Sequence, residues 1–266
     1  MKMKQLTLAT LCILFGLSCS KPKEEVLENE YKRITLISTS IAPFGTDSLI
    51  IDLNSNSTIQ SIMAYERSGG NFILRQTKTE FYYLPDSQQI DSTFIESQGW
   101  LGNTSSYIEK FVYENGKIVK SYRLSAGTVN VIDSVIYSYN SEGKLRDKFT
   151  YEGYIPESFT YHTNYKYNED NLSSVSTINS QFMKVRLIRF FGTDGKKNPF
   201  NRLFKKNGYL FVLNILPSEI MLCSNNPTFL YIDELSINMS YKYNQYNDPI
   251  EVFSNWGHFN ARIIYE

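Results

Sequence analysis

The chain has 266 residues, a formal net charge of zero and aromatic side chains at 15% of its positions, with 20 Tyr and 17 Phe but only 2 Trp. A balanced charge leaves no electrostatic footprint for nucleic acid, so we expect no nucleic-acid partner. The length is compatible with a single all-β domain, because all-β units of this size are common.

The first residues have the pattern of an export signal. Two lysines precede an uncharged stretch at 6–17, which is shorter than the roughly 20 apolar residues of a membrane-spanning helix. The small residues Gly16 and Ser18 then precede Cys19. This segment resembles the lipobox of bacterial lipoproteins, although the usual Leu three residues before the Cys is absent. The resemblance implies that 1–18 is a signal peptide and that Cys19 carries palmitate-type acyl chains. An ordinary signal peptide with an incidental Cys is the alternative.

The next segment predicts a tether. Residues 19–30 comprise the lipidated Cys and a charged stretch without apolar periodicity, which is typical of a flexible linker. Lys23-Glu24-Glu25 resembles an acidic tag that sends some Bacteroidetes lipoproteins to the cell surface, but a solubilising spacer explains it equally well. We expect a protein lipid-anchored to the outer membrane, on its periplasmic face or at the cell surface. Cys223 is then the remaining unmodified thiol of the mature chain, and we interpret it as a buried apolar residue.

Residues 31–266 are predicted to form a single β-meander domain. In the segments 130–139, 159–167 and 237–243, apolar or aromatic side chains alternate with polar ones. Alternation of this kind is typical of antiparallel strands with one covered and one solvated face. In the second segment, His162 falls on the polar side, so we expect it to be solvated.

A recurring phrase joins the predicted strands. It consists of aromatic–x–aromatic, a polar turn ending in Gly or Asn, and a basic–apolar restart, and its clearest copy is 137–145. The second aromatic falls at Tyr113, Tyr139, Tyr167, Phe191 and Tyr243. Four equal turns lie at 140–143, 168–171, 192–195 and 244–247, and each ends in a residue that tolerates positive φ. Asn115-Gly116 has the preferred sequence of a two-residue hairpin. The phrase predicts a run of β-hairpins.

The segment from about 196 to 234 interrupts this rhythm. It contains an apolar run at 209–216 between two prolines, Pro199 and Pro217. We favour a loop with one or two helical turns that covers one sheet face. Inserted loops on rigid scaffolds often carry function, so this insertion is a candidate for it.

These features together support a resemblance. The Tyr-Asn-x-x-Gly-Lys-Leu phrases resemble the YD repeats of the RHS family, with Asn140, Asn168 and Asn244 where that family has Asp. The lipobox, the phrases and the Asn-Pro-Phe and Asn-Asn-Pro elements resemble uncharacterised Bacteroidetes lipoproteins with a domain of unknown function described as porin-like. The resemblance implies a long β-meander and brings no catalytic residues. Because RHS shells need many more repeats, five or so phrases predict an open, curved sheet or an incomplete barrel.

The sequence offers little catalytic chemistry. His162 and His258 are far apart and lack ligand-like spacing, and the chain has neither a Gly-x-Ser-x-Gly elbow nor a phosphate loop. We therefore expect no metal, no cofactor and no enzyme, although scattered carboxylates such as Asp133 and Glu109 keep a carbohydrate-active enzyme as a remote alternative.

Two function hypotheses remain. The first is an envelope interaction protein that binds a glycan, a peptide or another envelope protein, with Trp100 and Trp256 as candidate ligand-binding residues. The second is a structural envelope component, in which both tryptophans only pack at sheet ends. A minor hypothesis is O-glycosylation at the Asp-Ser-Leu, Asp-Ser-Thr and Asp-Ser-Val tripeptides, whose serines are Ser48, Ser92 and Ser134.

Overall fold

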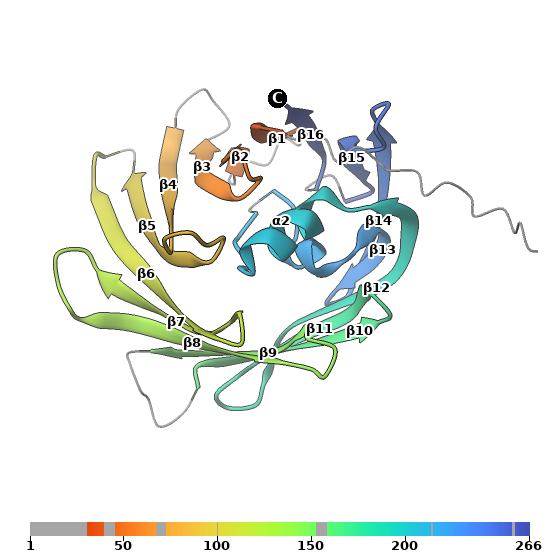
Figure 1. Cartoon of the computed structure of the whole chain (residues 1–266). Helices are drawn as coiled ribbons and strands as arrows, with labels where there is room; N and C mark the ends of the chain where they lie inside the picture. The colour runs from red at the N-terminus through yellow and green to blue at the C-terminus, as the bar shows by residue number, and fades with distance from the viewer. Residues whose placement is uncertain are drawn as a thin grey trace, which may run out of the picture.

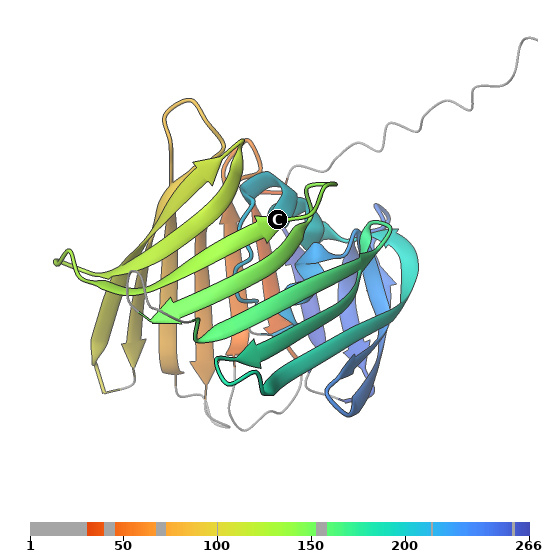
Figure 2. The ribbon, with the colours of Figure 1, turned by 90° about the horizontal axis from the view of Figure 1, so that it is seen from below.

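A computed structural model describes residues 31–39, 46–67, 73–99, 101–152, 159–213, 215–256 and 259–266. Within these ranges sixteen antiparallel strands form a closed barrel in which each strand pairs with its neighbours in the chain (Figure 1). The strands are β1 (Arg33–Ser38), β2 (Thr46–Leu53), β3 (Ile59–Arg67), β4 (Ile73–Tyr83), β5 (Ile90–Gly99), β6 (Thr104–Glu114), β7 (Lys117–Ser125), β8 (Val131–Tyr139), β9 (Leu145–Glu152), β10 (Tyr161–Asn168), β11 (Asn171–Asn179), β12 (Lys184–Lys197), β13 (Asn225–Ile232), β14 (Leu235–Tyr243), β15 (Pro249–Ser254) and β16 (Ala261–Tyr265). They run side by side around the wall (Figure 2).

The expectation of an open sheet or an incomplete barrel is wrong. β1 pairs with β16 over five residue pairs, which include Ile34 with Tyr265 and Leu36 with Ile263, and this pairing closes the ring. The expectation failed because it counted only the clear phrases. The first five strands lack the phrase and still complete the barrel.

Alternation along the strands separates an inner from an outer face. In β1, Ile34 and Leu36 are buried and point inward, whereas Arg33 and Ile37 are exposed on the other face. The predicted strands at 130–139, 159–167 and 237–243 correspond to β8, β10 and β14. Their alternation follows from the barrel, since one face of each strand lines the interior.

Local turn chemistry explains most of the hairpins. Asn115 and Gly116 both have positive φ, as a type I′ hairpin turn requires, and Gly143 and Asn247 close their turns in the left-handed region as predicted. Asn140 starts its turn because its side-chain oxygen accepts from the backbone N–H groups of Glu142 and Lys144, at 3.1 and 2.8 Å. Asn244 starts its own turn in the same way, and this explains the Asn of the phrase.

Two predicted turns are wrong. The turn at 168–171 is shorter than expected, because the strands run up to Asn168 and resume at Asn171, and Glu169 takes the positive φ instead. Residues 192–195 do not form a turn and belong to the long strand β12, which pairs irregularly with β13. Gly195 has a φ of 74°, so this position is a distortion within the strand.

Tyrosines, among them Tyr113 and Tyr139 of the phrase, link neighbouring strands at one end of the barrel. Near the end of five even-numbered strands, a tyrosine hydroxyl donates to a backbone carbonyl near the start of the preceding strand. The pairs are Tyr83 with Ile59, Tyr113 with Ile90, Tyr139 with Ile118, Tyr241 with Pro227 and Tyr265 with Pro249. The basic residue of the restart adds a second contact, since Lys117 Nζ lies 5.1 Å from the Tyr139 ring centroid. The phrase therefore has a structural role.

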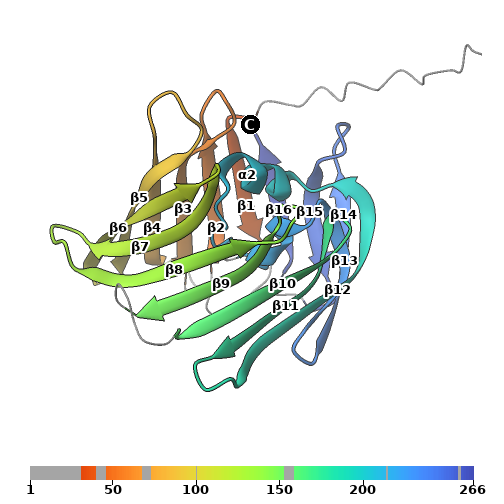
Figure 3. The ribbon, with the colours of Figure 1, turned by 60° about the horizontal axis from the view of Figure 1, so that its bottom comes forward.

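The predicted insertion enters the barrel. We call residues 198–224, apart from 214, the plug. It contains the helix α2 (Pro199–Asn207) and the 3₁₀-helix η1 (Ser218–Leu222), and it lies inside the ring (Figures 1 and 3). Asn198 caps α2 by accepting from Phe200 N, and its amide donates to the Ile220 and Cys223 carbonyls at 2.6 and 3.0 Å. The helical turns and the burial of this segment agree with the prediction. The two ends of the predicted insertion, however, belong to strands β12 and β13.

Candidate functional site

The inner face of the barrel has two different halves. On β1, β2 and β14–β16 the inward side chains are aliphatic, pack on the plug and are almost fully buried. They include Ile34, Leu36, Leu49, Ile51, Ile237, Met239, Val252, Ala261 and Ile263. On β6–β9 many inward side chains are polar or aromatic and only half-buried. They include Tyr107, Phe111, Arg123, Asp133, Val135, Tyr137, Lys148 and Thr150.

Partial burial inside a closed barrel is informative. An inward side chain keeps accessible surface only where the lumen beside it is not filled. On the plug, Val212 is 64% exposed between the buried Phe211 and Leu213. The plug therefore seals one half of the lumen and leaves space along the other.

A continuous row of polar side chains crosses the barrel wall at one height. Five inward residues on β8–β12 are direct cross-strand neighbours, and we call them the lumenal row. They are Tyr137, Lys148, Thr163, Thr177 and Arg186. The hydroxyls of Thr163 and Thr177 lie 3.0 Å apart. Because the members come from five strands, only the closed fold brings them together.

Lys148 is the exceptional member of the lumenal row. Its Nζ makes no ion pair or hydrogen bond with any residue that the structure describes. Burial lowers the pKa of Lys148 below the ordinary value of 10.5, while the charges of Glu219 and Glu109 act in the opposite direction. The Lys148 ammonium is therefore only partly removed from water, and it gains no carboxylate contact within the described residues.

The plug supplies an acid to the end of the row. Arg186 Nη1 donates to Glu219 Oε1 at 2.8 Å, which links β12 to η1. Glu219 is 9% exposed, and its Oε2 atom has no hydrogen-bond partner among the described residues. A buried carboxylate oxygen without a donor is an acceptor that is available to a ligand.

A second acid anchors the plug to the wall. The Tyr209 hydroxyl donates to Glu109 Oε2 at 2.7 Å, and the Tyr209 ring packs edge-on against Phe111 with centroids 5.1 Å apart. Burial raises the pKa of Glu109, although hydrogen bonds from Tyr209 and Ser121 favour its ionised form. Burial also raises the pKa of Tyr209 well above its ordinary value. This pair therefore fixes one edge of the lumen.

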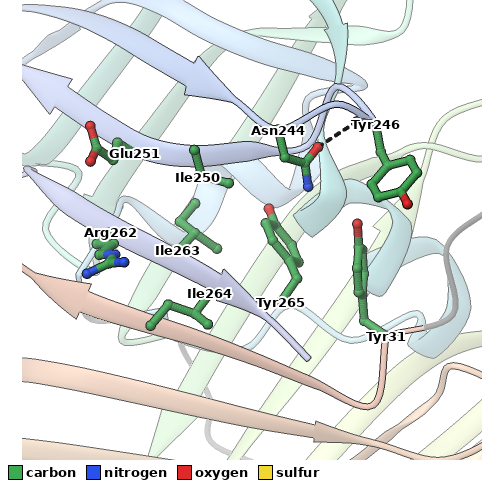
Figure 4. Close-up of a pocket in the computed structure, with 9 residues that line it drawn as sticks. All are labelled: Tyr31, Asn244, Tyr246, Ile250, Glu251, Arg262, Ile263, Ile264 and Tyr265. Atoms are coloured by element: carbon green, nitrogen blue, oxygen red, sulfur yellow. Dashed lines mark hydrogen bonds between the residues drawn. The ribbon is translucent and has the colours of Figure 1, made fainter.

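A pocket of about 340 Å³ lies elsewhere, at the seam where β15, β16 and the start of the described chain meet (Figure 4). The Tyr31 and Tyr265 rings are 4.6 Å apart, the Tyr31 hydroxyl donates to the Asp248 carboxylate, and the Tyr265 hydroxyl donates to Pro249 O at 2.9 Å. These polar groups already satisfy one another across the seam. We interpret the pocket as part of barrel closure.

The outer wall carries charge at mid-height. Lys78, the central residue of β4, points outward and forms an ion pair with Glu80 at 2.6 Å. Lys242 pairs with Glu251 on β14 and β15 at 2.7 Å, nearer the end of β14. A barrel wall that faces hydrocarbon has an apolar band at mid-height, and charged residues there are costly. At β4 the outer wall is therefore suited to water.

Of the predicted site residues, the structure describes Trp256, which does not belong to the lumenal row. Trp256 is 39% exposed at the turn after β15, where its ring lies 5.4 Å from that of Phe259. Trp100 and Cys19 lie outside the described residues, as does His258. Cys223 is buried, and burial raises the pKa of its thiol to about 12, as expected for a packing residue.

His162 faces outward as predicted, but it is not simply solvated. Its Nε2 lies 3.0 Å from Asp147 Oδ1, and its ring stacks on Phe149 at 4.2 Å. Burial alone would raise the pKa of Asp147, but hydrogen bonds from Asn164, His162 and other neighbours hold it well below its ordinary range. Of the three serines in the O-glycosylation tripeptides, Ser92 and Ser134 are buried in strands and Ser48 is half-buried on β2, and their glycosylation stays a prediction.

Sequence reasoning missed the lumenal row, and only its register could have revealed it. Lys148 stands opposite Tyr137, which the alternation of β8 had already placed on the covered face. Extending that face across one hairpin would have placed Lys148 on the covered side as well. Among the described residues, no group of acids, His and Cys has the geometry to hold a metal ion, and no helix is both long and apolar enough to cross a membrane.

Comparisons with known proteins bear on the fold. No family model and no curated protein matches this sequence. The chain is similar to a porin-like protein from Bacteroides uniformis, with a TM-score of 0.56 and 11% identity over 90% of this chain and 98% of that one. It also aligns with 11% of a chain in a TcdB2–TccC3–Cdc42 complex at a TM-score of 0.31, and with 11% of a chain in a Photorhabdus luminescens Tc holotoxin pore at 0.19, values too low to carry an argument. The first similarity shows that this barrel architecture occurs in a protein described as porin-like.

Proposed function

We propose that this protein is a non-catalytic binding protein of the cell envelope that holds a small ligand inside its barrel. A lipid anchor at Cys19 tethers the barrel to the outer membrane, and residues 20–30 serve as the linker. The barrel itself stands in water beside the membrane, and this is supported by the ion pairs on its outer wall, of which Lys78 with Glu80 lies at mid-height.

One observation carries the binding function. Inward side chains on β6–β9 keep accessible surface, while the plug seals the opposite half of the lumen. Binding sites are typically concave and partly apolar, with a few converging polar groups. The space beside the lumenal row has that composition, with tyrosine rings on the wall and the Glu219 carboxylate on the plug.

The alternative is a structural envelope component without a small ligand. The tyrosine hydroxyls at one barrel end and the seam pocket are explained by stability alone, and they fit either function. The lumenal polar groups without partners among the described residues favour binding, because a purely structural barrel gains nothing from a buried Glu219 oxygen without a donor and a half-buried Lys148 ammonium without an acid.

The proposal is tested by thermal unfolding of the full-length protein in detergent with a panel of neutral sugars, sugar acids and amino acids. A parallel screen uses Val135→Trp, which places an indole in the lumen next to the row. At a hundredfold excess over Kd, a ligand stabilises by about 2.7 kcal/mol, which is several degrees in Tm.

We expect at least one compound to raise the Tm of the wild type and not that of Val135→Trp. The variant alone should unfold cooperatively. A panel in which no compound stabilises the wild type, or one that stabilises both proteins equally, contradicts a ligand in the lumen and favours the structural role.

A further inference from the structure

We propose that the lumenal row binds a sugar acid, with its carboxylate on Lys148 and its hydroxyl groups on the threonines and Glu219. This inference rests on the proposed function and specifies its ligand class. It is carried by the unmatched hydrogen-bonding and charge requirements of residues that lie side by side along the wall and at its contact with the plug.

The charge of Lys148 calls for an anion. The nearby acids are already engaged, since Glu109 accepts from Tyr209 and Glu219 Oε1 accepts from Arg186. Lys148 therefore lacks a contact carboxylate within the described part of the chain. A desolvated ammonium is stabilised when a carboxylate reaches it at hydrogen-bond distance, and a ligand can provide one.

The unpaired charge next to the row disfavours an amine as the second group of the ligand. Arg186 is paired with Glu219, whereas Glu109 acts on Lys148 only at longer range, so within the described residues Lys148 is the cation of the row without a contact acid. A ligand ammonium beside Lys148 would meet a like charge, whereas a carboxylate neutralises it. An amino acid or a peptide terminus is therefore a poorer match than a carboxylate with neutral substituents.

The remaining polar groups match hydroxyls. Glu219 Oε2 is a buried acceptor without a donor, and the two threonine hydroxyls at 3.0 Å can both donate and accept. Sugar hydroxyls also both donate and accept, so they satisfy either kind of group. The half-buried Tyr137 side chain, cross-strand neighbour of Lys148, adds an aromatic ring of the kind that contacts the C–H face of a sugar.

The test compares sugars that differ at a single carbon. The full-length protein in detergent is titrated calorimetrically with D-galacturonate and D-glucuronate, and then with D-galactose and D-glucose, in which the carboxylate is replaced by CH₂OH. We expect saturable binding of at least one uronate and at least tenfold weaker binding of the neutral sugar with the same ring. Inorganic phosphate serves as the control for unspecific anion binding.

Two variants locate the site. Lys148→Met should weaken uronate binding at least tenfold, and it should melt no lower than the wild type because it removes a buried unpaired charge. Lys166→Met is the matched control, since Lys166 lies on the next strand but faces outward and is exposed, and its uronate binding should not change.

Absence of uronate binding overturns this inference, and so does equal binding of the neutral sugar, stronger binding of phosphate, or a Lys148→Met variant that binds like the wild type. The proposed function is judged by a different result. If neutral sugars or amino acids stabilise the wild type but not Val135→Trp, lumenal binding stands and only the sugar-acid assignment is wrong.

Discussion

Glu109 shows how a single side chain couples the plug to the wall at an energetic cost. It is buried on the inner face of β6 and accepts a hydrogen bond from the Tyr209 hydroxyl at 2.7 Å. Its pKa is lowered by a hydrogen bond with Ser121 and by the charge of Arg123, and it is raised by the charge of Asp133. Burial raises its pKa above the ordinary 4.5, so the folded protein holds this proton to a higher pH than the unfolded chain does. In that window the unfolded state binds fewer protons, and stability falls as the pH rises.

Replacing this carboxyl with an amide should therefore stabilise the protein at neutral pH. Glu109→Gln keeps an oxygen for the Tyr209 hydroxyl but cannot ionise, so its free energy of unfolding should exceed that of the wild type at pH 7.5. At pH 4 the two proteins should be equal. Urea unfolding at both pH values measures the difference.

Glu96→Gln provides the control for this pH comparison, since Glu96 is an exposed, outward residue of β5. Its effect should be small at both pH values. If Glu109→Gln is less stable than the wild type at pH 7.5, or if its effect does not depend on pH, then burial does not raise the pKa of Glu109 in the folded protein.

At the scale of elements, tyrosines such as Tyr113 and Tyr139 stabilise a hairpin end by bonding to the preceding strand. Tyr139→Phe removes the hydroxyl that donates to Ile118 O at 2.7 Å and keeps the ring under Lys117. We expect it to lower the free energy of unfolding by about 1 kcal/mol, the typical contribution of such a bond. A shift of the urea midpoint at unchanged slope measures the loss.

The matched control is Tyr82→Phe. Tyr82 is an outward residue that is 50% exposed, and its hydroxyl reaches only the exposed Glu80. This change should alter stability by less than roughly 0.5 kcal/mol. Equal effects of the two substitutions would mean that the interstrand tyrosine bond contributes nothing specific.

Elements of this kind were predictable because their signals are local. Strand period, the Asn115-Gly116 hairpin, and the Asn–Gly turn of 140–143 depend on residues within one or two hairpins. The prediction of a turn at 192–195 was wrong because Phe191 and Gly195 match the sequence of the phrase but lie within β12, where the strand pairs irregularly with β13. Positive φ at Gly195 fits both interpretations, so the sequence alone could not separate them.

At the scale of the whole molecule, closure and the site were beyond the sequence pattern. Pairing of β1 with β16 joins residues more than two hundred positions apart, and no local signal marks it. The lumenal row depends on the same closure, because Lys148 and Glu219 come from β9 and the plug. The aromatic candidate Trp256 drew attention by its residue type, yet it lies at a hairpin end and packs on Phe259.

A disulfide across the seam tests the central claim, a closed barrel with an interior, most directly. Thr35 and Ile264 are outward partners on β1 and β16. Directly opposed residues in such a ladder have Cα atoms about 5.5 Å apart, which suits a disulfide bond. Thr35→Cys with Asn238→Cys is the control, because β14 does not neighbour β1.

After mild oxidation of each double variant, peptide mapping by mass spectrometry identifies the linked cysteines. The closed barrel predicts a 35–264 disulfide in most molecules and no 35–238 disulfide. Free thiols at 35 and 264 under the same conditions would contradict closure, and with it the lumen on which the proposed function depends.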